Sequence, residues 1–292
     1  MNAHGQAGNT MSPAIAPTIS AHGAAMPAVG YGTMLFPEPE RAVGLVQHAL
    51  ACGYRHIDTA RKYGSEQWVG EGIRASGLPR TDLWVTTKVT EENAKADDFA
   101  RSVETSLETL GLDYVDLLLI HWPQPRVPLE ETLGALARAK RDGLARNIGV
   151  SNFTIALLDE AVAKCPEPLF TNQIEYHAYL RQDRLIAACR KHGLLVTCYA
   201  PLARTAVMKD SVVKAIAAAH SKTPAQIALR WLVQQPDVGI VPRALEFAEI
   251  EENIELFDFV LTTQEMDAIG ALRDNNLRVV SPEVRRPDWD EG

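Results

Sequence analysis

The stretch "DDFARSVETSLETLGLDYVDLLLIHWP", residues 97–123, contains one complete unit of a helix followed by a strand. In its first half, four apolar residues recur at the three- and four-residue spacing of an amphipathic helix: Phe99, Val103, Leu107 and Leu110. Gly111 supplies a helix stop, and the apolar run from Val115 to His121 predicts a buried strand.

The same unit recurs from Gly30 to the end of the chain. Eight apolar runs predict strands at Gly30–Thr33, Tyr54–Asp58, Leu83–Lys88, Val115–His121, Asn147–Val150, Phe170–Ile174, Leu195–Tyr199 and Gly239–Val241. Helical patterns lie between them, such as residues 128–143, which end at Gly143, and residues 223–235, which open with Thr223 as N-cap and Pro224. No GxGxxG turn follows the first strand, so the sequence predicts a (β/α)8 TIM barrel and not a doubly wound sheet.

The segment before the first unit, "PTISAHGAAMPAVG" from Pro17 to Gly30, alternates around Gly23 and predicts a hairpin that closes the bottom of the barrel. Residues 1–16 are rich in Ala, Gly and Pro and predict a flexible tail. Residues 17–292 are expected to form one domain that includes the C-terminal tail.

Composition limits the classes of partner. Of 292 residues, 29 are Lys or Arg and 37 are Asp or Glu, for a net charge of -8 without a basic cluster. This balance argues against nucleic acid and anionic membranes and favours a small-molecule substrate. The chain shows no basic and apolar leader and no apolar run that would span a bilayer, so we expect a cytoplasmic protein. The cysteines have no paired spacing, so we expect reduced thiols. We also expect a monomer.

Four ionisable residues stand at or just beyond the ends of predicted strands, where barrels carry their chemistry. They are Asp58, Tyr63, Lys88 and His121. A tyrosine with an ordinary pKa of about 10 donates a proton poorly at neutral pH unless a cation lowers that pKa, and Lys88 is the candidate cation. Asp58 would keep Lys88 charged and aimed, and His121 would orient a substrate carbonyl.

Each of these residues alone also fits a structural role, as a helix cap, a packed ring, a solvated lysine or a core histidine. A metal-dependent hydrolase on a similar barrel would place His and Asp at strand ends too, but it would need a His-x-His pair or a carboxylated lysine. The segment "YRHID" offers only one histidine, so no metal site is expected.

Six motifs occur in an order that resembles the aldo-keto reductase superfamily. They are "GYRHIDTARKYGSEQWVGEGI", "TTKV", "DLLLIHWP", "IGVSNF", "NQIEYHAYL" and "CYAPLA", and the likeness runs from about Gly30 to the C-terminus. Within the superfamily the chain is most similar to bacterial 2,5-diketo-D-gluconic acid reductases, which also act on methylglyoxal. The resemblance implies NAD(P)H-dependent reduction of small aldehydes, α-dicarbonyls or keto-sugar acids. A non-catalytic, nucleotide-binding regulatory relative is the alternative.

The resemblance also implies roles for individual residues. Tyr63 would be the general acid, tuned by Asp58 and Lys88. The expected cofactor contacts are Ser151, Asn152 and Gln173 on the nicotinamide carboxamide, Tyr199 stacked on the ring, and Pro201, Leu202 and Ala203 near the pyrophosphate. Trp122 and Met34 are expected at the substrate pocket, with Met34 and Thr90 standing where many relatives carry tryptophan.

The loop "GIVPRALEFAEIEEN", residues 239–253, would grip the adenosine end of the cofactor. Many relatives read "IPKS" followed by an arginine, and those cations hold the 2′-phosphate of NADPH. Here the corresponding positions are Arg243, Ala244 and Glu249, with Glu246 between them, while Glu252 and Asn253 match the adenine contacts. Carboxylates near a ribose favour a 2′-hydroxyl over a phosphate, which favours NADH or dual use. The other interpretation is that Glu246 and Glu249 face water and Arg243 alone holds the phosphate.

Overall fold

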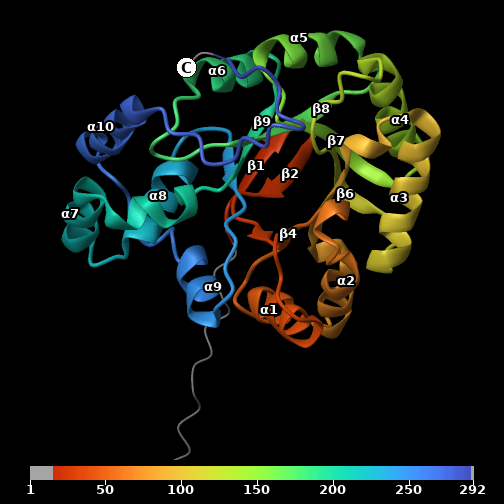
Figure 1. Cartoon of the computed structure of the whole chain (residues 1–292). Coiled ribbons are helices and arrows are strands. Elements are labelled where there is room, and N and C mark those ends of the chain that lie inside the picture. The colour runs from red at the N-terminus through yellow and green to blue at the C-terminus, as the bar shows by residue number, and fades with distance from the viewer. Residues whose placement is uncertain (1–15, 291–292) are drawn as a thin grey trace, which may run out of the picture.

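The strands form a closed parallel barrel surrounded by helices (Figure 1). The computed structural model describes residues 16–290, so the expected tail lies outside the described residues except for Ala16, which is buried. In chain order, which is also their order around the sheet, the barrel strands are β3 (Tyr31–Gly32), β4 (His56–Asp58), β5 (Trp84–Val89), β6 (Val115–Ile120), β7 (Ala145–Ser151), β8 (Leu169–Glu175), β9 (Leu195–Tyr199) and β10 (Val238–Ile240). The Gly30 and Gly32 amides close the ring by donating to the carbonyl oxygens of Ile240 and Pro242, at 2.8 and 3.0 Å.

Helices follow the strands and cover the outside of the barrel (Figure 1). They are α1 (Pro39–Ala51), α2 (Glu66–Ala75), α3 (Ala96–Leu110), α4 (Leu129–Arg141), α5 (Ile155–Lys164), α6 (Asp183–Lys191), α7 (Ser211–His220), α8 (Pro224–Val233), α9 (Phe247–Ile254) and α10 (Thr263–Ala271). Short 3-10 helices are η1 (Arg61–Tyr63), η2 (Arg80–Asp82), η3 (Glu91–Asn93), η4 (Ala203–Lys209) and η5 (Leu272–Asn275).

The predicted barrel is confirmed. All eight strands are present, and each strand end lies within two residues of its predicted position. Helix α3 ends at the predicted stop, where Gly111 adopts a φ of 66° that glycine tolerates without a Cβ clash. Helix α8 begins with a capping box, because the Thr223 hydroxyl accepts from the Gln226 backbone amide and Gln226 Oε1 accepts from the Thr223 backbone amide.

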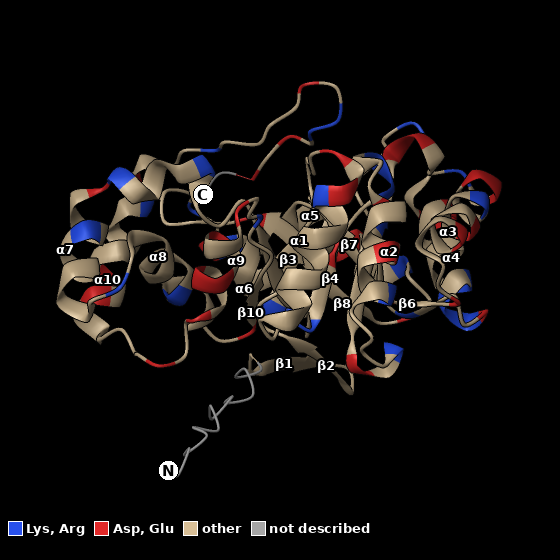
Figure 2. Cartoon of the chain, turned by 90° about the horizontal axis from the view of Figure 1, so that it is seen from below, with Lys and Arg blue, Asp and Glu red and all other residues tan. Residues whose placement is uncertain are grey.

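The predicted hairpin closes one end of the barrel. Strands β1 (Thr18–Ala21) and β2 (Ala24–Pro27) pair antiparallel across His22 and Gly23, whose φ values of 49° and 80° suit a tight two-residue turn. Apolar side chains of the hairpin, including Met26, pack on the residues that fill this end of the barrel: Trp84, Leu117, Leu119, Phe170 and Leu195. Figure 2 shows the hairpin at the end of the barrel opposite the C-terminal segment.

A buried histidine inside the barrel makes the free energy of unfolding depend on pH. The ring of His56 bonds to the Thr86 hydroxyl at 3.0 Å, and burial lowers its pKa from 6.5 to about 4. As pH falls, the unfolded chain binds this proton before the folded one, so stability decreases from the ordinary histidine pKa down to the folded value. Between about pH 7 and pH 5, the wild type should lose about 2 kcal/mol more than His56→Gln in denaturant titrations. Equal losses in the two proteins would contradict this assignment.

Candidate active site

A buried ion pair forms the base of the site. Asp58 is the last residue of β4 and Lys88 lies near the end of the neighbouring β5, so both side chains meet at the carboxyl end of the barrel. The Lys88 ammonium, which has no exposed side-chain surface, donates to Asp58 Oδ1 at 2.5 Å and to the Thr59 carbonyl at 2.8 Å. Burial lowers the pKa of Lys88, but its interactions with Asp58 and Tyr63 together raise it by more, so its net pKa lies above the ordinary value. Lys88 therefore stays a cation.

Tyr63 lies beside this pair, at the end of η1 in the loop after β4. The Lys88 nitrogen is 5.3 Å from the centre of its ring, and the ring meets that of His121 edge to face at 5.8 Å. Burial raises the pKa of Tyr63, and Lys88 lowers it by less, so the net pKa lies above the ordinary value. Lys88 acts in the predicted direction, but desolvation outweighs it. The phenol therefore carries its proton at neutral pH.

His121 follows the last residue of β6 and completes the predicted group of four. Burial lowers the pKa of His121 well below its ordinary value, and the positive charges of Lys88, Arg285 and Lys62 lower it further. The ring is therefore neutral at physiological pH, with one N–H donor and one acceptor nitrogen. Its Nδ1 is buried without a hydrogen-bond partner among the described residues. A neutral ring of this kind suits polarisation of a carbonyl by hydrogen bonding.

The four residues predicted to contact the nicotinamide lie beside the group formed by Asp58, Tyr63, Lys88 and His121. They lie at or near the carboxyl ends of three consecutive strands, β7 to β9: Ser151, Asn152, Gln173 and Tyr199. The Tyr199 hydroxyl donates to Asn152 Oδ1 at 2.6 Å, and Asn152 Nδ2 donates to the His121 carbonyl at 3.0 Å and to the Ser151 hydroxyl at 3.1 Å.

Gln173 joins this group to the ion pair, because its Nε2 donates to Asp58 Oδ2 at 2.7 Å. Both carboxylate oxygens of Asp58 therefore have partners, one in Lys88 and the other in Gln173. The Ser151 hydroxyl donates to the Gln173 carbonyl at 2.8 Å, so the two sets of predicted residues form one hydrogen-bonded unit. Tyr63 joins this unit through the contacts of its ring with Lys88 and His121.

The segment after β9 has an unusual backbone. Ala200, Ala203, Arg204 and Thr205 all have φ between 48° and 73°, in the left-handed region where non-glycine residues are strained. Pro201 and Ala203 are buried and Leu202 is half-buried, so the predicted pyrophosphate segment is held in a defined shape next to Tyr199.

In the predicted adenosine loop, the acidic side chains already have protein partners. Glu246 pairs with Arg41 of α1 at 2.7 Å, and Glu249 accepts from the Leu245 amide at 3.2 Å. Glu252 accepts from the Thr223 hydroxyl. Arg243 is exposed and Asn253 is buried. The loop therefore presents fewer free carboxylates than its sequence suggested.

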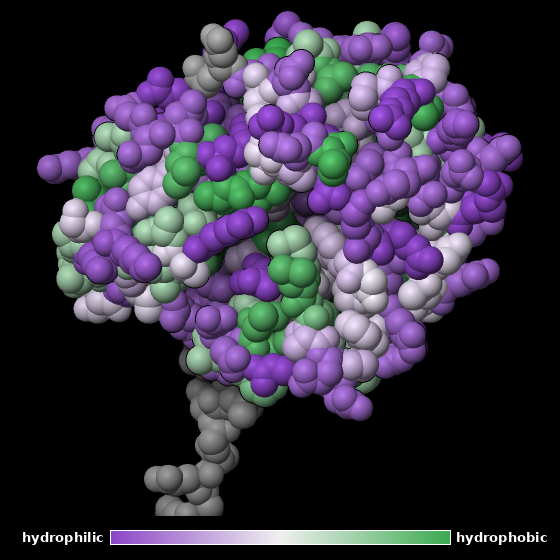
Figure 3. All heavy atoms as spheres, viewed as in Figure 1, coloured by the Kyte–Doolittle hydropathy of each residue, from purple (hydrophilic) through white to green (hydrophobic). Residues whose placement is uncertain are grey.

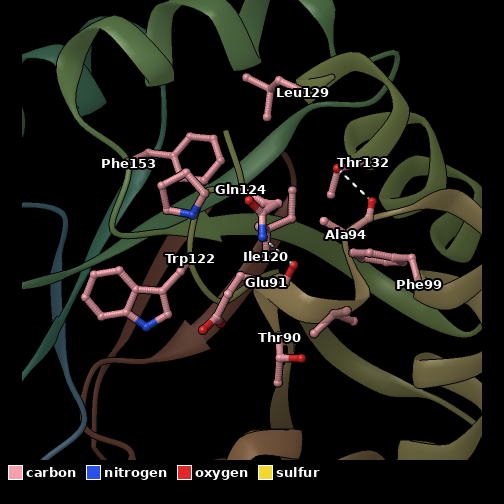
Figure 4. A pocket seen from close by; sticks show the side chains of 12 residues that line it. Thr90, Glu91, Ala94, Phe99, Ile120, Trp122, Gln124, Leu129, Thr132 and Phe153 are labelled. Atoms are coloured by element: carbon pink, nitrogen blue, oxygen red, sulfur yellow. Dashed lines mark hydrogen bonds between the residues drawn. The ribbon is translucent and has the colours of Figure 1, made fainter. Parts of the chain in front are cut away.

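The two predicted substrate residues differ in exposure. Met34, in the loop after β3, is 45% exposed, whereas Trp122 is buried. Figure 3 shows hydrophobic side chains gathered near the middle of a face that is otherwise mostly hydrophilic. Beside Trp122, a cavity lined also by Thr90, Glu91 and Phe153 has a volume of about 10 Å³ (Figure 4). It holds at most a single water molecule, so it is no substrate pocket.

Sequence reasoning missed the contribution of the C-terminal segment, residues 278–290. The Arg285 guanidinium lies 5.4 Å from the centre of the Trp122 ring and 3.4 Å from the Glu91 carboxylate, and Trp289 meets Trp122 at 6.1 Å. Glu175 anchors this segment by accepting from the amides of Val279 and Val280, at 2.6 and 2.8 Å. Three arginines and one tryptophan within thirteen residues that lack helical periodicity were a signal that could have indicated these contacts.

Comparison with known proteins places this chain in a family. Residues 28–274 match the model of the Aldo/keto reductase family. Methylglyoxal reductase DkgB of Escherichia coli O157:H7 is 42% identical over 269 residues, which cover 91% of this chain and 100% of the relative.

Two solved structures have the same fold. A crystal structure described as a 2,5-diketo-D-gluconic acid reductase B superposes with a TM-score of 0.92 at 42% identity, covering 95% of this chain and 98% of that one. An aldo-keto reductase of Bombyx mori in complex with NADP superposes with a TM-score of 0.86 at 33% identity, covering 92% of this chain and 96% of that one.

None of the described helices is both long and apolar enough to cross a membrane. The chain belongs to the aldo/keto reductase family and is an oxidoreductase that reduces carbonyl groups.

Proposed function

We propose that this enzyme reduces small aldehydes and α-dicarbonyls such as methylglyoxal, and keto-sugar acids, to alcohols, with Tyr63 as the general acid. The observation that carries the proposal is the continuous hydrogen-bonded unit at the carboxyl end of the barrel. Gln173 bonds to Asp58, and Asn152 bonds to the His121 backbone, so the predicted nicotinamide residues and the catalytic residues are mutually positioned. The names of the similar proteins, a methylglyoxal reductase and a 2,5-diketo-D-gluconic acid reductase, support this substrate class.

The residues present fit a nicotinamide cofactor. Ser151, Asn152 and Gln173 offer amide and hydroxyl groups for a carboxamide, and Tyr199 offers a flat ring for stacking. Residues 201–203 would approach the pyrophosphate, and the loop that contains Arg243 would hold the adenosine end. When bound, the reduced nicotinamide supplies the hydride that the reaction requires.

The residues of this chain then carry out the rest of the chemistry. The neutral His121 donates a hydrogen bond that polarises and orients the substrate carbonyl. As the carbonyl carbon accepts a hydride, its oxygen gains negative charge, and the phenol of Tyr63 transfers its proton to that oxygen. The Lys88 cation stabilises the resulting phenolate, and Asp58 holds the ammonium in place. The product is an alcohol, and the phenol is reprotonated from solvent.

Reduction of methylglyoxal with NADH and NADPH, measured side by side through loss of the reduced-nicotinamide absorbance, tests this function. We expect turnover with at least one cofactor. If the protein binds nucleotide but turns over neither methylglyoxal nor any other small aldehyde, the non-catalytic alternative holds instead.

A further inference from the structure

The adenosine loop receives a cation from a distant part of the chain. Arg41, in the first turn of α1, donates through Nη2 to the Leu245 carbonyl and to Glu246 Oε1, each at 2.7 Å. Glu246 occupies the N-cap position of α9, yet its side chain does not cap that helix. The Glu246 carboxylate is instead turned towards Arg41.

Arg41 and Arg243 act on the same small region. The Tyr31 hydroxyl donates to the Ala244 carbonyl at 2.8 Å, in the middle of the loop. Arg243 directly precedes Ala244, and Arg41 bonds to the carbonyl of Leu245, which directly follows Ala244, so both cations adjoin the same short stretch of the loop. Glu249 accepts from the Leu245 amide and is thus tied to the loop's own backbone.

We propose that Arg41 is a second cation for the 2′-phosphate of NADPH, beside Arg243, and that Glu246 competes with this phosphate for Arg41. The inference rests on the proposed nucleotide-dependent function. Glu249 stands where many relatives carry an arginine, and Arg41 of α1 would supply the cation that is missing there. The expected preference therefore moves from NADH towards NADPH. The enzyme should then accept NADPH as well as NADH, with Glu246 setting the ratio.

Arg41 can exchange Glu246 for a phosphate because the ion pair between them is exposed. The side chains of Arg41 and Glu246 are 43% and 68% exposed. An exposed ion pair of this kind contributes about 0–1 kcal/mol, and so it is readily exchanged. A phosphate dianion carries more charge than a carboxylate and accepts two parallel N–H bonds from a guanidinium. NADH presents only a hydroxyl, which leaves the Arg41–Glu246 pair intact.

Dissociation constants measured by quenching of tryptophan fluorescence, without substrate, test the proposal. Arg41→Met should weaken NADPH binding by about tenfold to a hundredfold, because a charged hydrogen bond is lost, while NADH binding changes less than about twofold. Glu246→Gln should tighten NADPH relative to NADH by up to about fivefold, because the competing carboxylate is gone. NADPH affinity should also depend more steeply on salt in the wild type than in Arg41→Met.

Arg138→Met is the matched control, because Arg138 pairs with Asp142 on the exposed face of α4. It should alter neither dissociation constant. Equal weakening of NADPH and NADH in Arg41→Met would overturn the proposal and show that Arg41 only supports the loop. Unchanged binding of both cofactors would overturn it too. If the wild type binds neither nucleotide, the proposed function itself fails, which is a distinct result.

Discussion

Replacing Tyr63 with phenylalanine is expected to lower kcat for methylglyoxal by about 10²–10⁴-fold, because the reaction loses its proton donor. The ring should keep its place, since its contacts with His121 and Lys88 are made by the ring itself. The dissociation constant of the nucleotide should therefore change little. Steady-state kinetics together with fluorescence quenching would separate the loss of the chemical step from a loss of binding.

Tyr114→Phe provides a matched control for this substitution. Tyr114 directly precedes β6, at the opposite end of the barrel from His121, and its buried hydroxyl has no partner among the described residues. This variant should keep the kcat of the wild type. If Tyr63→Phe retained more than about a tenth of the wild-type kcat, Tyr63 would not be the general acid.

Replacing Lys88 with methionine should affect both stability and activity. The substitution leaves the Asp58 carboxylate buried with Gln173 as its remaining side-chain donor, and removing one partner of a buried ion pair costs about 3–5 kcal/mol. It also removes the charge that lowers the pKa of Tyr63 and stabilises the phenolate. We expect a lower midpoint in denaturant titrations and a loss of kcat of at least about a hundredfold.

The double variant Asp58→Asn, Lys88→Met distinguishes the two effects. It removes both buried charges, so it should recover much of the lost stability, but it should not recover kcat. Lys140→Met, which breaks the half-buried surface pair with Glu167, should cost no more than about 1 kcal/mol. A Lys88→Met protein as stable as Lys140→Met, or a double variant with wild-type kcat, would contradict the role given to Lys88.

Local patterns in the sequence predicted the barrel and the meeting of polar residues at one of its ends. The apolar stripes of the helices, the Gly111 stop and the Thr223 cap each depend on residues close together in the sequence, and each appears in the structure. Because parallel strands end at one edge, the ends of successive strands also indicated that Asp58, Lys88 and His121 would converge.

Contacts between distant segments could not be predicted in the same way. Arg41 and Glu246 are 205 positions apart, and nothing in the sequence of α1 indicates that its arginine reaches the adenosine loop. The bond between Gln173 and Asp58 likewise depends on how the side chains fill the barrel. The sequence also indicated the cation that acts on Tyr63, but the larger effect of burial on its pKa emerged only from the packed structure.

We expect a substrate carbonyl bound at this site to accept a hydride from a nicotinamide while Tyr63 supplies the proton. The most direct test runs the methylglyoxal reaction twice, each time with a reduced nicotinamide that carries deuterium on one of the two faces of C4. We expect one of the two labelled cofactors to give an alcohol that carries deuterium on its carbinol carbon, and Tyr63→Phe to lose this product. An alcohol product without deuterium from either labelled cofactor would contradict hydride transfer from the nicotinamide.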